Sequence, residues 1–191
     1  MSKLSEDQKK EFVNHCIKDA GMLLCNENVV FPSLCGIGGD WNTIMTLIED
    51  REVFHSKVFK ARTTYLSKEL YFYLKWFKQR KVLGETEKRI FDFLEETGGA
   101  DTEMVKNSLM LGSKEFKKSM DKLLSDLQVT VLSRGKSLSE SWTALVWGTY
   151  LQWESGCMAD QYSLTNEECH TCIHQILSKN LSSKDIERML R

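Results

Sequence analysis

The segment between residues 85 and 149 constrains the fold more strongly than any other part of the chain. Three helical patterns follow one another within it. Gly98 and Gly99 end the first, Asp101 is placed to cap the second, and Gly112 precedes the third. The apolar stripes contain Ile90, Phe93, Leu94, Met104, Val105, Leu109, Phe116, Met120, Leu123, Leu124 and Leu127. This spacing predicts three short helices in quick succession.

A strand pattern follows the third helix directly. Val129 and Val131 alternate with polar residues, a basic turn follows at Arg134 and Lys136, and the run WTALVWGTYLQW predicts a returning strand. Three helices followed by two strands around a basic turn are the order typical of a winged helix. We therefore expect residues 84–160 to form a winged-helix domain.

Helical patterns also precede this segment. Ser5 and Gln8 form a capping-box signature, and Gly21 is placed to end that helix. Between residues 22 and 40 we expect irregular chain with a short apolar strand. Two later stripes have helical spacing, the second opening at Ser67: Val53, Phe54, Val58 and Phe59, then Leu66, Leu70, Tyr73, Leu74 and Phe77. Residues 1–83 are therefore predicted to form an N-terminal helical region.

The end of the chain repeats the start of the central segment. Thr165 and Glu168 form another capping box, and a second short helix with Ile186 and Leu190 follows a polar turn. Residues 161–191 are predicted to form a C-terminal helical hairpin that resembles a truncated helix-turn-helix. The predicted fold class is mainly α with a small β wing.

The composition is that of an ordinary globular protein. The net charge is -1 and 28% of the residues are charged, which excludes a wholly basic nucleic-acid coat. There is no run of the roughly 18 apolar residues that a membrane span needs, and the start, MSKLSEDQKKEF, is too polar for a signal peptide. We expect a cytoplasmic protein without membrane contact, whose six cysteines are reduced thiols.

Several stretches resemble a known family. RTTYLSKELYFYLKWF, TEKRIFDFLEETGGADTEMVKNSL, FKKSMDKLLSDLQVTVLSRG and WTALVWGTYLQW are similar to the AlkZ-type winged-helix superfamily, bacterial proteins that include DNA glycosylases for crosslink repair. The N-terminal part ending in FPSL is similar to smaller AlkZ-related members. The resemblance implies the fold and a role in DNA repair or regulation.

The catalytic element of those glycosylases has no match here. They carry Gln-x-Gln or Gln-x-Asp, and the nearest stretch in this chain is Gln152-Trp153-Glu154. We therefore predict no catalytic residue, and a glycosylase with a non-standard site is the enzymatic alternative.

Two groups of basic residues are candidates for contact with DNA. A third helix in the major groove and a wing on the backbone would neutralise phosphates with Lys114, Lys117, Lys118, Lys122, Arg134 and Lys136. Acidic Glu115, Asp121 and Asp126 on the same helix favour a merely solvated face, and the shortage of Arg, Asn or Gln predicts low sequence specificity. The second group is Arg62, Lys75, Lys78 and Arg80, in a basic segment whose aromatic residues are expected in the core.

Metal and cofactor signals are weaker. Cys169 and Cys172 lie on an apolar stripe and are predicted to be buried structural thiols. Glu167, His170 and His174 share a helix side and, with a second pair from Glu52 and His55, would suit a di-iron bundle. The His-x-x-x-His stretch lacks the internal glutamate of a metalloprotease, and the glycine-rich loop at residues 36–40 follows no convincing strand. The prediction is no metal and no cofactor.

Taken together, the residues and the resemblance predict a protein that binds duplex DNA with low sequence specificity, either non-specifically or by recognising DNA structure, in a repair-related or regulatory role. The alternative from another class is a winged helix used for protein interaction or homodimerisation, favoured by the near-zero net charge.

Overall fold

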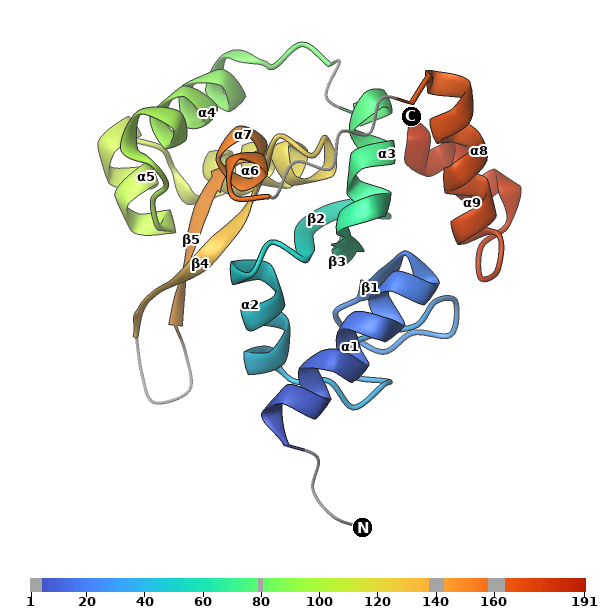
Figure 1. The fold of residues 1–191 in the computed structure, drawn as a ribbon. Helices are drawn as coiled ribbons and strands as arrows, with labels where there is room; N and C mark the ends of the chain where they lie inside the picture. The colour runs from blue at the N-terminus through green and yellow to red at the C-terminus, as the bar shows by residue number, and fades with distance from the viewer. Residues whose placement is uncertain (1–4, 79–80, 138–142, 158–163) are drawn as a thin grey trace.

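The computed structural model describes residues 5–78, 81–137, 143–157 and 164–191. The N-terminal region, up to residue 78, contains α1 (Glu6–Ala20), β1 (Met22–Leu24), α2 (Trp41–Glu49), β2 (Val53–Phe59), β3 (Arg62–Ser67) and α3 (Lys68–Lys78). The strands form an antiparallel sheet in the order β1-β3-β2. The predicted N-terminal helical region is therefore a mixed layer of helices around a small sheet (Figure 1).

The first helix has the predicted ends. Ser5 Oγ accepts a hydrogen bond from the Gln8 backbone N–H, and the Gln8 side chain accepts one from the Ser5 N–H. Gly21 ends the helix with φ 78°, a conformation that costs other residues energy. A Cβ there would lie 2.3 Å from a side-chain carbon of Ile176, so the glycine also lets the helix α8 (Asn166–Leu177) approach.

The helical stripe predicted over residues 53–59 is wrong, because these residues form β2. The side chains of β2 are buried on both faces of the sheet. Such a strand lacks the alternation of apolar and polar residues by which a half-buried strand is recognised in a sequence. The turn into β3 is made by Lys60 and Ala61, both with positive φ (51° and 54°), as in a tight hairpin. Neither residue is the glycine or asparagine that usually marks such a turn. Leu66, predicted to be helical, belongs to β3.

The central segment follows the predicted order. It contains α4 (Glu85–Thr97), α5 (Thr102–Leu109), α6 (Ser113–Ser125), β4 (Val129–Ser137) and β5 (Thr143–Thr149). Gly98 ends α4 in the left-handed conformation, and the Asp101 carboxylate accepts a hydrogen bond from the Met104 N–H at 2.8 Å. Ala100 forms an isolated antiparallel bridge with Trp147 of β5. This single residue extends the two-stranded β4–β5 sheet on the side of β5.

The returning strand is shorter than predicted. It ends at Thr149, and the next residues form α7 (Tyr150–Ser155). Thr149 and Gln152 make a reciprocal capping box that starts this helix. The apolar run continues through both elements, so its hydrophobicity alone does not mark the change.

The C-terminal hairpin is present as predicted. It consists of α8 (Asn166–Leu177), capped by Thr165 and Glu168, and α9 (Ser183–Leu190), capped by Ser182. Figure 1 shows α8 and α9 beside α3, with α4 and α5 on the other side of the molecule. Ile173 and Ile186 are buried in one cluster with Leu74 of α3.

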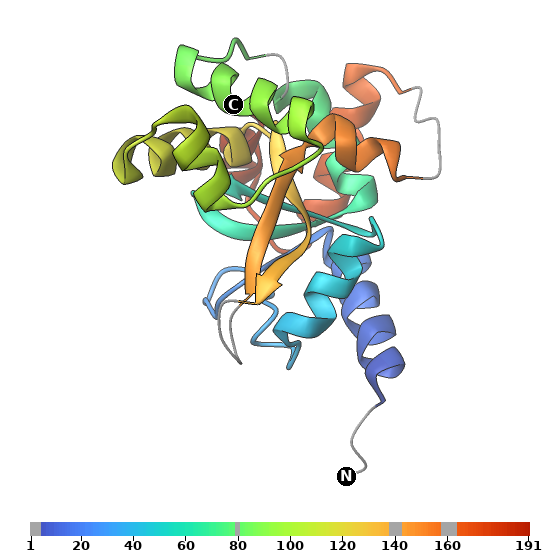
Figure 2. The ribbon, with the colours of Figure 1, turned by 90° about the vertical axis from the view of Figure 1, so that its left-hand side faces the viewer.

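The sheet of the N-terminal region packs against the central segment. Thr130 Oγ1 of β4 donates to the His55 carbonyl at 2.9 Å and accepts from the His55 N–H at 3.1 Å. The β4–β5 hairpin runs alongside α2 (Figure 2).

The division of the chain into three domains at residues 84 and 160 stays a prediction, since close packing joins the parts on either side of the first boundary. Among the described residues, no helix is both long and apolar enough to cross a membrane. The cytoplasmic location also stays a prediction.

Candidate nucleic-acid interface

One face of α6 presents three exposed lysines. The helix buries Phe116, Met120, Leu123 and Leu124, which hold it against the central segment. Lys114, Lys117 and Lys118 lie on the solvent side. Within the part of the chain that the structure describes, none of their ammonium groups pairs with a carboxylate. Among the described residues, three positive charges therefore stand at the surface of one helix without an ion-pair partner.

The acidic residues of α6 and its C-cap, Asp126, have partners elsewhere. The Asp121 carboxylate pairs with Lys57 of β2 at 2.5 Å, and the Asp126 carboxylate, only 6% exposed, pairs with Lys81 at 2.7 Å. Glu115 accepts a hydrogen bond from Thr86 of α4 at 3.0 Å. Two of the three acidic charges that argued against a cationic face are thus offset by lysines from other parts of the chain.

Lys122 is less available than the other three. Its ammonium lies 3.8 Å from the Glu87 carboxylate of α4, which also accepts a hydrogen bond from Ser119. Lys122 therefore lies at the margin of the cationic face.

The two basic residues of β4 have different environments. Lys136 is exposed and borders a groove of about 690 Å³ between the start of α5 and β5, lined also by Met104 and Leu145. Arg134 instead ties the hairpin to α2. Its guanidinium pairs with the Glu49 carboxylate at 2.6 Å and donates to the Asn42 carbonyl at 2.8 Å. Contact of Arg134 with a phosphate would compete with these bonds.

The tyrosines of the basic aromatic segment lie in the core, as predicted, and Phe72 and Phe77 pack against it, whereas Trp76 is 36% exposed. Tyr71 stacks on Phe54, with ring centroids 4.1 Å apart, and both contact Trp153. Lys75 pairs with the Glu154 carboxylate at 2.8 Å and lies over the Phe72 ring.

The remaining candidates of this segment differ in their exposure. Lys78 is buried, whereas Arg62 is exposed at the β2–β3 turn. Arg80 lies outside the described residues. Of Arg62, Lys75 and Lys78, the three candidate DNA-binding residues of this segment that the structure describes, Arg62 is the exposed one.

The burial of Lys78 is expected to lower the stability of the folded protein. Burial, with the neighbouring charge of Lys81, lowers the pKa of Lys78 from 10.5 to about 8. A charged Lys78 therefore destabilises the fold, and Lys78→Met is expected to raise the free energy of unfolding at pH 7 by about 2 to 3 kcal/mol. Urea denaturation of the two proteins measures the difference.

The sign of the pH dependence follows from linkage. Between the folded-state pKa of about 8 and the unfolded value of 10.5, the unfolded chain binds more protons, so the stability contributed by Lys78 rises with pH. The gain from Lys78→Met should be complete below pH 8 and decline toward pH 10.5. Lys75→Met is the matched control and should destabilise, because it leaves Glu154 without its cation. An equal loss of stability in both variants would contradict the prediction.

The nearest match to the glycosylase element has structural roles. Gln152 Oε1 accepts from the Thr149 N–H at 3.0 Å, and Gln152 Nε2 donates to the Leu94 carbonyl at 2.7 Å. Glu154 accepts hydrogen bonds from the Tyr71 hydroxyl and the Lys75 ammonium. Both side chains therefore connect α7 to neighbouring helices.

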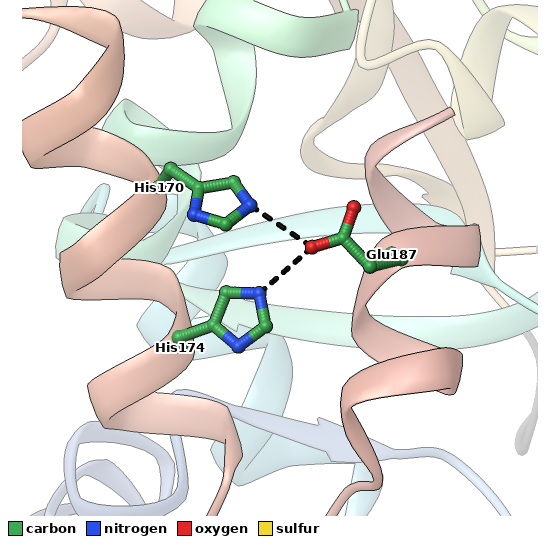
Figure 3. Close-up of side chains that lie close together, drawn as sticks. All are labelled: His170, His174 and Glu187. Carbon is green, nitrogen blue, oxygen red and sulfur yellow. Dashed lines mark hydrogen bonds and ion pairs between the residues drawn. The ribbon is translucent and has the colours of Figure 1, made fainter.

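The di-iron arrangement weighed as an alternative does not form among the described residues. His55 is buried on β2, where burial lowers its pKa to about 4, and Glu52 pairs with Lys18 at 2.9 Å. Neither residue joins α8. His170 and His174 instead meet Glu187 of α9 (Figure 3). No sequence motif pointed to Glu187, although the predicted hairpin places the two short helices side by side.

The cysteines are free thiols. Cys169 is buried, as predicted, and Cys172 is half-buried against the same core.

Comparison with known proteins is informative at the level of the family. Searches of the curated proteins and of the solved structures each gave no significant match. The model of the family described as "AlkZ related" matches residues 11–191, which is nearly the whole chain. The chain therefore belongs to the AlkZ-related family.

Proposed function

We propose that this protein binds duplex DNA with low sequence specificity, in a role related to DNA repair or its regulation. The observation that carries the proposal is the exposed face of α6. Its three lysines lack carboxylate partners among the described residues, while Asp121 and Asp126 are neutralised by Lys57 and Lys81. Membership of the AlkZ-related family supports the repair context.

The order of elements supports a winged-helix mode of binding. In that arrangement α6 is the third helix, which lies in the major groove, and the β4–β5 hairpin is the wing. Lys114, Lys117 and Lys118 would contact phosphates, with Lys136 reaching the neighbouring backbone. Lysine offers a point charge rather than the paired donors that read guanine or adenine edges, so sequence specificity is low.

Salt-dependent binding is the expected result for the wild-type protein. Because phosphate neutralisation releases counterions, the affinity for a labelled duplex should fall as salt rises, with a log–log slope of about −0.9 per contact. The three α6 lysines and Lys136 predict a slope of about −3 to −4. Fluorescence anisotropy at several salt concentrations measures it, with scrambled duplexes as the control for specificity. Absence of binding at low salt would contradict the proposal.

A protein-interaction surface is the second candidate. Met104 is about half exposed and Met110 is almost fully exposed, and Met104 and Leu145 line the groove beside Lys136. Methionines of this kind adapt to apolar partners. Concentration-dependent mass in light scattering, together with no DNA binding at low salt, would favour this candidate in its homodimer form. Base excision is not proposed, because Gln152 and Glu154 are engaged within the fold.

A further inference from the structure

Two histidines of α8 converge on one carboxylate of α9. His170 Nε2 lies 2.9 Å and His174 Nε2 lies 3.0 Å from the same oxygen, Glu187 Oε1 (Figure 3). The three side chains each offer one possible metal-ligand atom, a ring nitrogen or a carboxylate oxygen, and these three atoms lie within 4.8 Å of one another. Within the described residues, this is the one group of three or more His, Cys, Asp or Glu side chains close enough to hold a metal ion.

The fold holds the three side chains in this arrangement. His170 and His174 are four residues apart, so they lie on the same side of α8 in successive turns. Ile173 and Leu177 of α8 and Ile186 and Met189 of α9 are buried in one core, which fixes how the helices face each other. Glu187, next to Ile186, is thereby directed toward the histidines rather than into free solvent.

The two nitrogen–oxygen distances are close to those around a tetrahedral ion bound by nitrogen and oxygen. Zinc lies about 2.0 to 2.2 Å from His nitrogen and carboxylate oxygen, so ligand atoms at a tetrahedral angle are about 3.3 Å apart. The two N–O separations of 2.9 and 3.0 Å need to lengthen by only a few tenths of an ångström. The imidazole centroids, 4.5 Å apart, are already side by side.

We propose that His170, His174 and Glu187 bind one Zn²⁺ ion between α8 and α9, through the two Nε2 atoms and the carboxylate. All three side chains are partly exposed, so water can take the fourth position. Mg²⁺ and Ca²⁺ are poorly matched, because they prefer oxygen ligands alone. The ion would link the terminal helix to α8 and stabilise the folded hairpin by its binding free energy. This proposal replaces the sequence-based expectation of no metal.

The free cysteines are the main competitors for zinc. Cys172 lies on α8 itself and is half-buried, and Cys35 is exposed. Co²⁺ distinguishes the two kinds of site, because thiolate ligation gives an intense near-ultraviolet charge-transfer band that nitrogen and oxygen ligands do not give. A Cys172→Ser variant tests the nearest thiol directly.

The test uses the full chain under reducing conditions without a chelating buffer or a histidine tag. Isothermal titration calorimetry with Zn²⁺ should give one ion per chain, and the Co²⁺ form should lack the thiolate band. Glu187→Gln and His174→Gln are each expected to weaken the affinity at least tenfold and to abolish the rise in melting temperature that Zn²⁺ causes. Circular dichroism of the metal-free variants checks that they are folded.

Two matched variants complete the experiment. His15→Gln removes an exposed histidine of α1 by the same substitution, and it should bind Zn²⁺ like the wild type, as should Cys172→Ser. The proposal is overturned by a wild-type protein that binds no Zn²⁺, by a thiolate band in the Co²⁺ form, or by full affinity in folded Glu187→Gln and His174→Gln.

Discussion

Reversing the charge of Lys117 and Lys118 on α6 is expected to lower the affinity for duplex DNA about tenfold to 100-fold at low salt. The double variant Lys117→Glu, Lys118→Glu removes two phosphate contacts and adds repulsion at the same place. The slope of log affinity against log salt should become shallower by about two, because each lost contact no longer releases its counterion. Fluorescence anisotropy with one labelled duplex, titrated at several salt concentrations, measures both quantities.

A matched double variant separates the site from the overall charge. Lys179→Glu with Lys184→Glu changes the net charge by the same amount in the α8–α9 hairpin, on the other side of α3 from α4 and α5 (Figure 1). We expect it to retain most of the affinity and the wild-type salt slope. Equal losses in the two variants would mean that only the net charge matters, and no loss in the α6 variant would remove that face from the binding site.

Replacing Trp153 by alanine is expected to destabilise the protein by about 3 to 5 kcal/mol, the range for the loss of a large buried aromatic side chain. Trp153 is fully buried, and its ring contacts those of Phe54 and Tyr71, with centroids 5.1 and 4.9 Å away. It therefore connects α7 to β2 and α3. Urea denaturation followed by far-ultraviolet circular dichroism measures the change without relying on tryptophan fluorescence.

The control is a tryptophan at the surface. Trp41, at the start of α2, is 42% exposed, and Trp41→Ala should change the free energy of unfolding by less than about 1 kcal/mol. If Trp153→Ala cost no more than this control, the core around α7 would not have the arrangement described.

Local signals were reliable where the chain carries them. The capping boxes at Ser5 and Thr165, the Asp101 cap and Gly98 lie at the ends that were predicted from them. These ends depend on hydrogen bonds between residues three positions apart or on the conformational freedom of glycine, so the sequence alone specifies them. The order α4, α5, α6, β4, β5 could be predicted for this reason.

Other features depend on which elements meet. Residues 53–59 form a strand because both faces are covered, and a buried strand and a buried helix have the same kind of apolar run. The pairs Asp121 with Lys57 and Asp126 with Lys81 join residues 64 and 45 positions apart. No short-range pattern indicates such pairs, so the charge that remains on α6 could not be read from its own residues.

The proposed zinc site shows both parts of this division. The sequence by itself determined that His170 and His174 share one side of a helix, because four residues are close to one helical turn. The tertiary structure alone decided that Glu187 meets them and that Glu52 and His55 do not. The physical reason is that helix and strand packing, driven by burial of apolar side chains such as Ile173 and Ile186, sets the distances between ligands that lie far apart in the chain.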